Sequence, residues 1–191
     1  MVSKKIASFD PASFRNLGWA IFSFVDKKKS KAACRAGTFI GTQPEYGPAS
    51  LWEFFEIIDE FLKNEKPDIV ILEKTSSFAG GFVTGQVSGC IAVIMALCGK
   101  HKIPTDSVFP THVKKVVTGS GKAKKGLIKQ SVIAILDDLK CHDFQADSGH
   151  AFDAISNIFC WLIDNEEYSL SCDIEKLREK TQKTKKVKKK K

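Results

Sequence analysis

The chain has 191 residues and a formal net charge of +8, and 43% of its residues are hydrophobic, including 14 phenylalanines. This composition excludes a disordered chain, and the length suits one domain with a full core. The excess charge lies at one end: residues 180–191 hold eight lysines and no acid, so residues 1–179 have no net charge. A polyanionic partner is therefore favoured. We expect a folded domain at 1–168 and a lysine-rich C-terminal tail at 169–191 that is disordered at its end.

Membrane and secreted classes are also excluded. No stretch reaches the ~18 uncharged apolar residues of a membrane span, and Asp10 and Arg15 interrupt any secretion signal. The six cysteines include no Cys-x-x-Cys pair. Cys141, His142 and His150 lack the second ligand pair that a zinc site needs. The sequence predicts an intracellular protein in a reducing compartment, with buried thiols.

The first part of the chain predicts an antiparallel meander followed by a helix. Apolar and aromatic runs indicate three strands, at residues 5–10, 18–25 and 32–41. The first strand is expected to end at Asp10, because Pro11 follows. A helix is expected from Pro48 to about Lys63, since apolar residues recur there at helical spacing, and Pro67 ends it.

The second part alternates strands and helices. Residues 68–73, Asp-Ile-Val-Ile-Leu-Glu, are typical of a central strand covered on both faces. The other expected elements are a helix at 83–100, a strand at 104–109, a short helix at 110–118, a basic helix at 123–140, and a helix at 148–164 capped by Asp147 or Ser148. This order predicts an α/β fold with a mixed sheet of about five strands, the first three antiparallel, flanked by helices.

Four potential metal ligands come from three of these elements. Asp10 and Glu73 end the two most apolar strands, at the sheet edge where α/β proteins bind ligands. His150 and Asp153 are three residues apart on the last helix and share a face. Oxygen ligands with one imidazole suit Mg²⁺, or Mn²⁺ as a substitute. The cluster predicts metal-assisted phosphodiester hydrolysis with two ions. Taken singly, each side chain also fits an ordinary structural role.

A basic segment and two aromatic residues suggest nucleic-acid contacts. The span from Val113 to Lys129 contains no acid. Its lysines are Lys114, Lys115, Lys122, Lys124, Lys125 and Lys129. They fit either a solvated helix face or a platform for a phosphate backbone. Phe78 and Phe82 follow Glu73 in a segment of small residues, and fit either stacking on bases or packing on the core.

These motifs resemble the RuvC-type Holliday junction resolvases of the ribonuclease H-like superfamily. The resemblance extends over about residues 4–163. The matching stretches are 6–13 with 17–20, 67–73, 111–125 and 150–155. The stretch 111–125 is the most specific of them, because several positions fit without a gap. In place of the family's usual Asp-Pro-Gly, this chain has Asp-Pro-Ala.

The resemblance implies a role for each candidate residue. The implied metal ligands are Asp10, Glu73, His150 and Asp153, with Asp147 as the alternative third ligand. Lys114 and Lys125 would hold the scissile region, and Lys125 would offset charge in the transition state. Phe78 or Phe82 would enter the junction.

The resemblance also implies a homodimer with the helix 83–100 at its seam and branched DNA as substrate. Two active sites would nick two strands symmetrically, leaving 5′-phosphate and 3′-hydroxyl ends. No small-molecule cofactor is expected. The expected setting is the cytoplasm of a bacterium or of a virus- or phage-infected cell. Two alternatives stay open: a ribonuclease H-like nuclease acting on RNA or flapped DNA, and a non-catalytic junction-binding protein.

Overall fold

The computed structural model describes residues 4–26, 31–74, 81–141, 144, 146–166, 176 and 179. Its strands are β1 (Lys5–Ser13), β2 (Asn16–Asp26), β3 (Lys31–Ile40), β4 (Ile69–Glu73) and β5 (Thr105–Val108). Its helices are α1 (Pro48–Glu65), α2 (Gly81–Lys100), α3 (Pro110–Thr118), α4 (Lys125–Asp138) and α5 (Gly149–Asp164). Every expected strand and helix is present, which confirms the α/β class.

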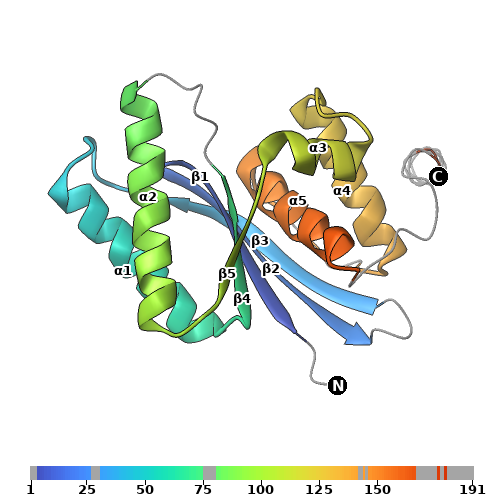
Figure 1. Ribbon diagram of the computed structural model, residues 1–191, viewed down its shortest axis with the longest axis horizontal. Coiled ribbons are helices and arrows are strands. Elements are labelled where there is room, and N and C mark those ends of the chain that lie inside the picture. The colour runs from blue at the N-terminus through green and yellow to red at the C-terminus, as the bar shows by residue number, and fades with distance from the viewer. Residues whose placement is uncertain are drawn as a thin grey trace, which may run out of the picture.

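The strands form one mixed sheet in the spatial order β3-β2-β1-β4-β5. β2 pairs antiparallel with both β1 and β3, whereas β4 pairs parallel with β1 and β5. Helices α1 and α2 cover one face of the sheet, and α3, α4 and α5 cover the other (Figure 1). No helix in the described part of the chain is long and apolar enough to cross a membrane.

Strand β1 lies at the centre of the sheet and serves both cores. Ile6 belongs to the hydrophobic cluster that includes α5, while Ala7 and Phe9 belong to the cluster under α1 and α2. Side chains alternate between the faces of a strand. Asp10 therefore shares the face of Ile6 and points toward α5.

β1 is longer than the sequence predicts. It ends at Ser13, so the predicted end at Asp10 was wrong. β4 pairs with β1 only from Ile6 to Phe9, so beyond Phe9 only β2 pairs with β1 among the described residues. A strand with one free side tolerates the missing N–H of Pro11, and the register shifts between Pro11 and Ser13. The last-but-one helix begins at Lys125 instead of residue 123, with Lys124 as its N-cap.

The cysteines fit the expected buried thiols. The cysteines within the described residues are all buried: Cys34, Cys90, Cys98, Cys141 and Cys160. Burial raises the pKa of the thiol of Cys98 to about 11. The Cys98 thiol is therefore protonated at neutral pH. Cys172 and His142 lie outside the described residues.

Candidate active site

Asp10 on β1 and two residues of α5 form the centre of the site. One ligand atom from each of Asp10, His150 and Asp153 lies within 4.8 Å of the others. The Nδ1 atom of His150 is 2.9 Å from Oδ2 of Asp10. All three residues are partly buried. The structure thus brings together three of the four metal ligands that the sequence predicts.

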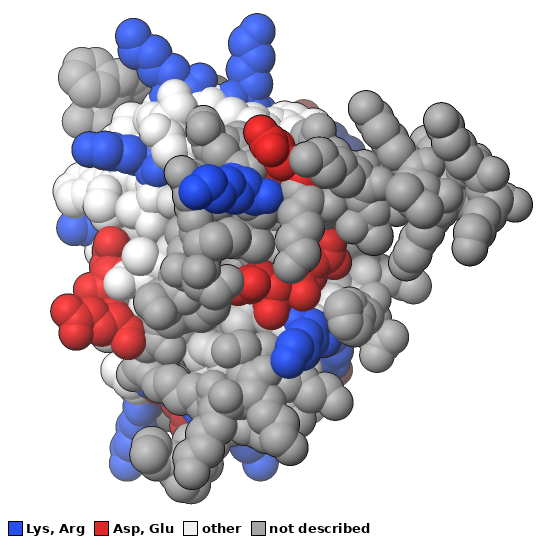
Figure 2. Space-filling model, turned by 90° about the vertical axis from the view of Figure 1, so that its right-hand side faces the viewer, with Lys and Arg blue, Asp and Glu red and all other residues white. Residues whose placement is uncertain are grey.

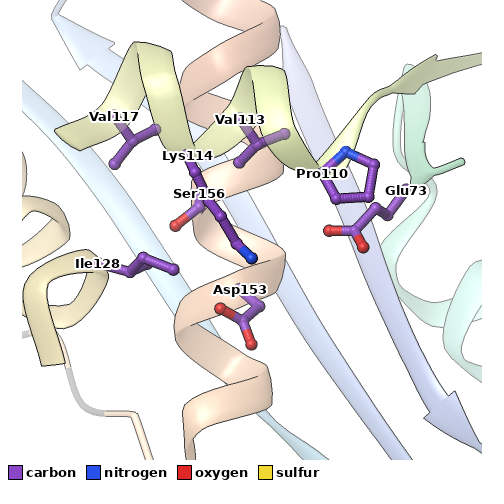
Figure 3. Close-up of a pocket in the computed structure, with 8 residues that line it drawn as sticks. All are labelled: Glu73, Pro110, Val113, Lys114, Val117, Ile128, Asp153 and Ser156. Atoms are coloured by element: carbon purple, nitrogen blue, oxygen red, sulfur yellow. The ribbon is translucent and has the colours of Figure 1, made fainter. Parts of the chain in front are cut away.

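Glu73, the fourth predicted ligand, ends β4 and borders this cluster. With Asp153 and Lys114 it lines a small pocket between α3, α4 and α5, whose remaining lining residues are Pro110, Val113, Val117, Ile128 and Ser156. Figure 3 shows the side chain of Lys114 reaching from α3 toward Asp153, with Glu73 on the other side of the opening. Three chain segments far apart in sequence therefore supply one acidic pocket.

The carboxylates of the site repel one another. Burial, followed by the negative charges of Asp10 and Asp153, raises the pKa of Glu73 to about 7. Burial and then Asp10 also raise the pKa of Asp153. The hydrogen bond to Asp10 is the main cause that raises the pKa of His150. The site therefore favours added positive charge, whether protons or a cation.

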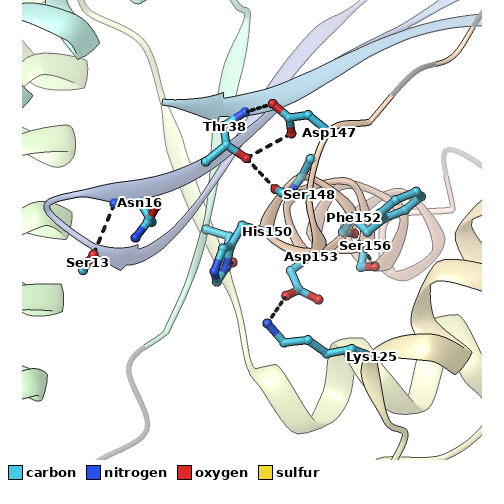
Figure 4. Close-up of polar contacts among 12 residues, drawn as sticks. Ser13, Asn16, Thr38, Lys125, Asp147, Ser148, His150, Phe152, Asp153 and Ser156 are labelled. Atoms are coloured by element: carbon cyan, nitrogen blue, oxygen red, sulfur yellow. Dashed lines mark hydrogen bonds and ion pairs between the residues drawn. The ribbon is translucent and has the colours of Figure 1, made fainter. Parts of the chain in front are cut away.

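Two lysines face these acids. The Nζ atom of Lys125, in the first turn of α4, is 3.7 Å from Oδ2 of Asp153 (Figure 4). Lys114 is half-buried in the pocket, and its charge, like that of Lys125, acts to lower the pKa of Glu73. Both amines therefore lie beside the carboxylates of the site.

The other lysines of the basic segment are on the surface. Lys115, Lys122 and Lys124 are exposed. Figure 2 shows several Lys and Arg side chains on the upper part of the face that it presents, with larger groups of acidic side chains below them. Exposed amines of this kind suit contacts to a phosphate backbone.

The aromatic predictions are outside what the structure describes. Phe78 lies outside the described residues, and Phe82 is in the first turn of α2 with its side chain also outside them. Sequence reasoning missed a further aromatic residue, Phe109, which is 58% exposed between β5 and α3. The Nζ atom of Lys74 lies 4.3 Å from the centre of the Phe109 ring. In the sequence, the position of Phe109 directly before Pro110, which starts α3, could have pointed to an exposed aromatic residue at this junction.

Two residues that position α5 were also missed. A Cβ built on Gly18 would lie 2.2 Å from the carbonyl oxygen of His150, so only glycine fits there. The backbone N–H and the hydroxyl of Thr38 donate to the carboxylate of Asp147 at 2.9 and 3.0 Å (Figure 4). The Asp147 carboxylate thus holds β3, and it is His150 that joins Asp10 and Asp153.

The donor set fits a divalent cation. Two carboxylates and an imidazole converge at Asp10, Asp153 and His150, and Glu73 stands beside them. Carboxylates bind Mg²⁺ or Mn²⁺, and one imidazole beside them is compatible with Mn²⁺ and tolerated by Mg²⁺. A cation would relieve the repulsion that raises the pKa values of Glu73 and Asp153. The acidic cluster can therefore hold metal.

A family model described as crossover junction endodeoxyribonuclease RuvC matches residues 6–160. The chain belongs to this family. The RuvC protein of Gloeobacter violaceus is 27% identical over 132 residues, which are 69% of this chain and 75% of that protein. The RuvC protein of Paenarthrobacter aurescens is 31% identical over 111 residues, or 58% of this chain and 59% of that protein. These bacterial RuvC relatives give no support to a viral or phage source.

Solved structures of Holliday junction resolvases share the fold. Thermus thermophilus RuvC in complex with a Holliday junction substrate matches with a TM-score of 0.72 and 18% sequence identity, covering 86% of this chain and 96% of that one. The yeast mitochondrial Holliday junction resolvase matches with a TM-score of 0.58 and 12% identity, covering 86% and 83%. The expected ribonuclease H-like fold is thereby confirmed.

Proposed function

We propose that this chain is a metal-dependent, structure-selective DNA endonuclease that resolves Holliday junctions by paired symmetric nicks. One observation carries the proposal: in a RuvC family member, the ligand atoms of Asp10, His150 and Asp153 lie within 4.8 Å of one another. Hydrolysis at the nick would leave 5′-phosphate and 3′-hydroxyl ends. Its biological setting would be recombination, repair or genome processing.

The metal would be Mg²⁺, with Mn²⁺ as a substitute and two ions per site. Asp10, Glu73, His150 and Asp153 are the residues that would hold it. When bound, divalent cations supply Lewis-acid stabilisation of the charge that develops at phosphorus and promote the attack of water. The raised pKa values of Glu73 and Asp153 support this assignment, since they mark a site built for positive charge.

The chain's own residues would bind and orient the scissile phosphate. Lys125 lies beside Asp153, and its amine would offset the negative charge that grows on the phosphate oxygens. Lys114, on the opposite wall of the pocket, would hold the same phosphate from α3. Without a cation, Nδ1 of His150 is hydrogen-bonded to the Asp10 carboxylate at 2.9 Å. With a cation bound, the imidazole would turn to the metal.

Exposed lysines would extend the DNA path. Lys115, Lys122 and Lys124 would contact backbone phosphates around the site, without reading sequence. Phe78 or Phe82 would enter the junction, as the family resemblance implies. The lysine-rich tail at 169–191 would add sequence-independent affinity to the nuclease domain at 1–168.

A homodimer would place two such sites on one junction. Helix α2 would form the seam, and its Met95 is 52% exposed, which suits a contact with a second copy. The bacterial relatives and the buried cysteines support an intracellular setting in the cytoplasm of a bacterium.

The decisive experiment is nicking of a synthetic four-way junction in Mg²⁺. The wild type should cut two strands of like polarity, and Asp10→Asn should lose at least ~100-fold in rate because it removes a charge from the centre. Glu60→Gln, a change of an exposed acid on α1, is the matched control and should cut at the wild-type rate. Equal cutting by wild type and Asp10→Asn would overturn the proposal.

Two comparisons separate the alternatives. Faster cutting of a flap, an RNA–DNA hybrid or a structured RNA than of the junction would favour a ribonuclease H-like nuclease with another substrate. Tight junction binding with no metal-dependent cutting would favour a binding protein. The junction should instead be the best substrate at equal salt.

A further inference from the structure

A second group of metal-binding side chains lies outside the catalytic cluster. His112 of α3 and Cys160 and Asp164 of α5 each offer one ligand atom, and these three atoms lie within 4.8 Å of one another. The Nε2 atom of His112 is 2.9 Å from Oδ2 of Asp164. The thiol of Cys160 donates to the same oxygen at 3.4 Å. The Asp164 carboxylate therefore joins the imidazole to the thiol.

Rigid elements hold this trio. Cys160 and Asp164 are four residues apart on α5, so they share one face of the helix. Val113 and Val117 of α3 are buried in the same hydrophobic cluster as Phe159 of α5, so the two helices are packed together. Little movement would be needed to turn all three donor atoms to one ion.

The trio is also separate from the catalytic centre. Asp164 follows Asp153 by eleven residues of the same helix, which corresponds to a distance of about 16 Å along its axis. The two groups share no residue. An ion at one of them would leave the other free.

The chemistry of the donors selects the kind of ion. Thiolate and imidazole are ligands of Zn²⁺ and similar ions, whereas Mg²⁺ takes oxygen. Three protein ligands leave one position of a tetrahedral zinc site for water, and the side chains of His112 and Asp164 are 48% and 39% exposed. The buried Cys160 closes the site on the inner side.

We propose that His112, Cys160 and Asp164 form a binding site for a single Zn²⁺-class ion that links α3 to α5. On binding, the Cys160 thiol gives up its proton to solvent, and His112 coordinates as the neutral imidazole. The hydrogen bonds from the thiol and the imidazole to Asp164 are replaced by bonds to the ion. The proposal does not depend on nuclease activity.

The link has a consequence for the catalytic pocket. Lys114, two residues after His112, lines the pocket that contains Glu73 and Asp153. An ion that fixes α3 on α5 would restrict the movement of Lys114 over these acids. The site would thus be a structural clamp at one end of α3, close to Lys114.

Binding of Co²⁺ to the full chain tests the proposal, because a thiolate ligand gives Co²⁺ an intense near-ultraviolet absorption. One equivalent should produce this band in the wild type and in Asp10→Asn, and Zn²⁺ should abolish it. The band should be lost in His112→Ala and in Cys160→Ser. Cys98→Ser, which changes another buried thiol, should keep it.

Thermal unfolding supplies an independent readout. Zn²⁺ at a hundredfold excess over its Kd should raise the Tm of the wild type and of Asp10→Asn by roughly 5–10 °C. The exposed variant His112→Ala should show no such rise. No thiolate band in the wild type, a band that survives in Cys160→Ser, or a band lost in Asp10→Asn would each overturn the proposal. In these cases the trio would be only a hydrogen-bonded contact between two helices.

Discussion

Gly18 lies opposite Asp10 in the β1–β2 ladder and directly against the start of α5. The helix can bring His150 to within hydrogen-bond distance of Asp10 because Gly18 has no side chain. The absence of a methyl group at Gly18 thus lets β1 and α5 approach closely enough to share the proposed metal site.

Gly18→Ala should therefore move His150 of α5 away from Asp10 of β1. The new Cβ would meet backbone atoms of His150, which cannot move aside cheaply, so we expect a fall of about 1–3 kcal/mol in the free energy of unfolding and a large loss of nicking. Gly99→Ala is the matched control, because nothing lies within 4 Å of a Cβ there. Urea unfolding and the junction assay check both variants. An unchanged nicking rate in Gly18→Ala would contradict the role of this contact.

A lysine at the acidic centre and an exposed lysine should affect different steps, the first the rate of nicking and the second the binding of DNA. Lys125→Ala should lower the single-turnover nicking rate at saturating protein by about 100-fold with little change in Kd, because its amine lies at the acidic centre. Lys115→Ala, an exposed change on α3, should instead weaken junction binding and reduce the salt dependence of binding by about one counterion. The reverse pattern would show that Lys125 only binds DNA.

Among the elements, helix α5 is held at its first turn by several hydrogen bonds. Its N-cap Ser148 accepts a hydrogen bond from the backbone N–H of Ala151 at 3.2 Å and contacts the hydroxyl of Thr38. The preceding Asp147 also binds Thr38. The first turn of α5 is thereby fixed to β3, and the next residues of that turn include His150.

Loss of this cap should weaken both the helix and the site. Ser148→Ala should lower the free energy of unfolding by ~1 kcal/mol and reduce nicking, since the first turn that carries His150 would fray. Ser148→Asn keeps a capping side chain and should retain most of both properties. Equal losses in the two variants would contradict a capping role for Ser148.

The sequence predicts the elements better than their contacts. Hydrophobic periodicity and proline positions locate every strand and helix within a few residues, because they depend on neighbours in the chain. The extension of β1 past Asp10 could not be predicted, since it depends on where β4 stops pairing. Likewise, the hydrogen bonds from Thr38 to Asp147 could not be predicted, because they depend on how β3 lies against the start of α5.

At the scale of the whole molecule, folding brings the carboxylates of β1, β4 and α5 close together. The residues of the proposed catalytic cluster could be picked out by their types, by the strand end at Glu73 and by the shared helix face of His150 and Asp153, although Asp10 lies inside β1 and not at its end. Their coupling could not be predicted, because β1, β4 and α5 meet only in the folded chain. The raised pKa values of Glu73, Asp153 and His150 are the result.

This coupling predicts a pH dependence of stability for the metal-free chain. All three groups hold protons more tightly when folded, so the stability that they contribute is present at low pH and is lost as the pH rises through their folded pKa values. For Glu73, a pKa of about 7 against the ordinary 4.5 corresponds to roughly 3 kcal/mol. In EDTA, the wild type should lose more stability between about pH 5 and 8 than Glu73→Gln does.

Urea unfolding of both proteins at several pH values makes this measurement. Mg²⁺ should reduce the loss in the wild type, since a bound cation takes the place of the protons. Identical pH profiles of wild type and Glu73→Gln would contradict the assigned environment of Glu73.

The order of the segments along the chain has a consequence during synthesis. Asp10 and Glu73 emerge from the ribosome early, but His150 and Asp153 belong to α5, the last long helix of the described chain. A nascent polypeptide that stops short of α5 has the acidic strands and no cutting centre. Nuclease activity should therefore arise only after translation has passed α5, so incomplete chains cannot nick the DNA around them.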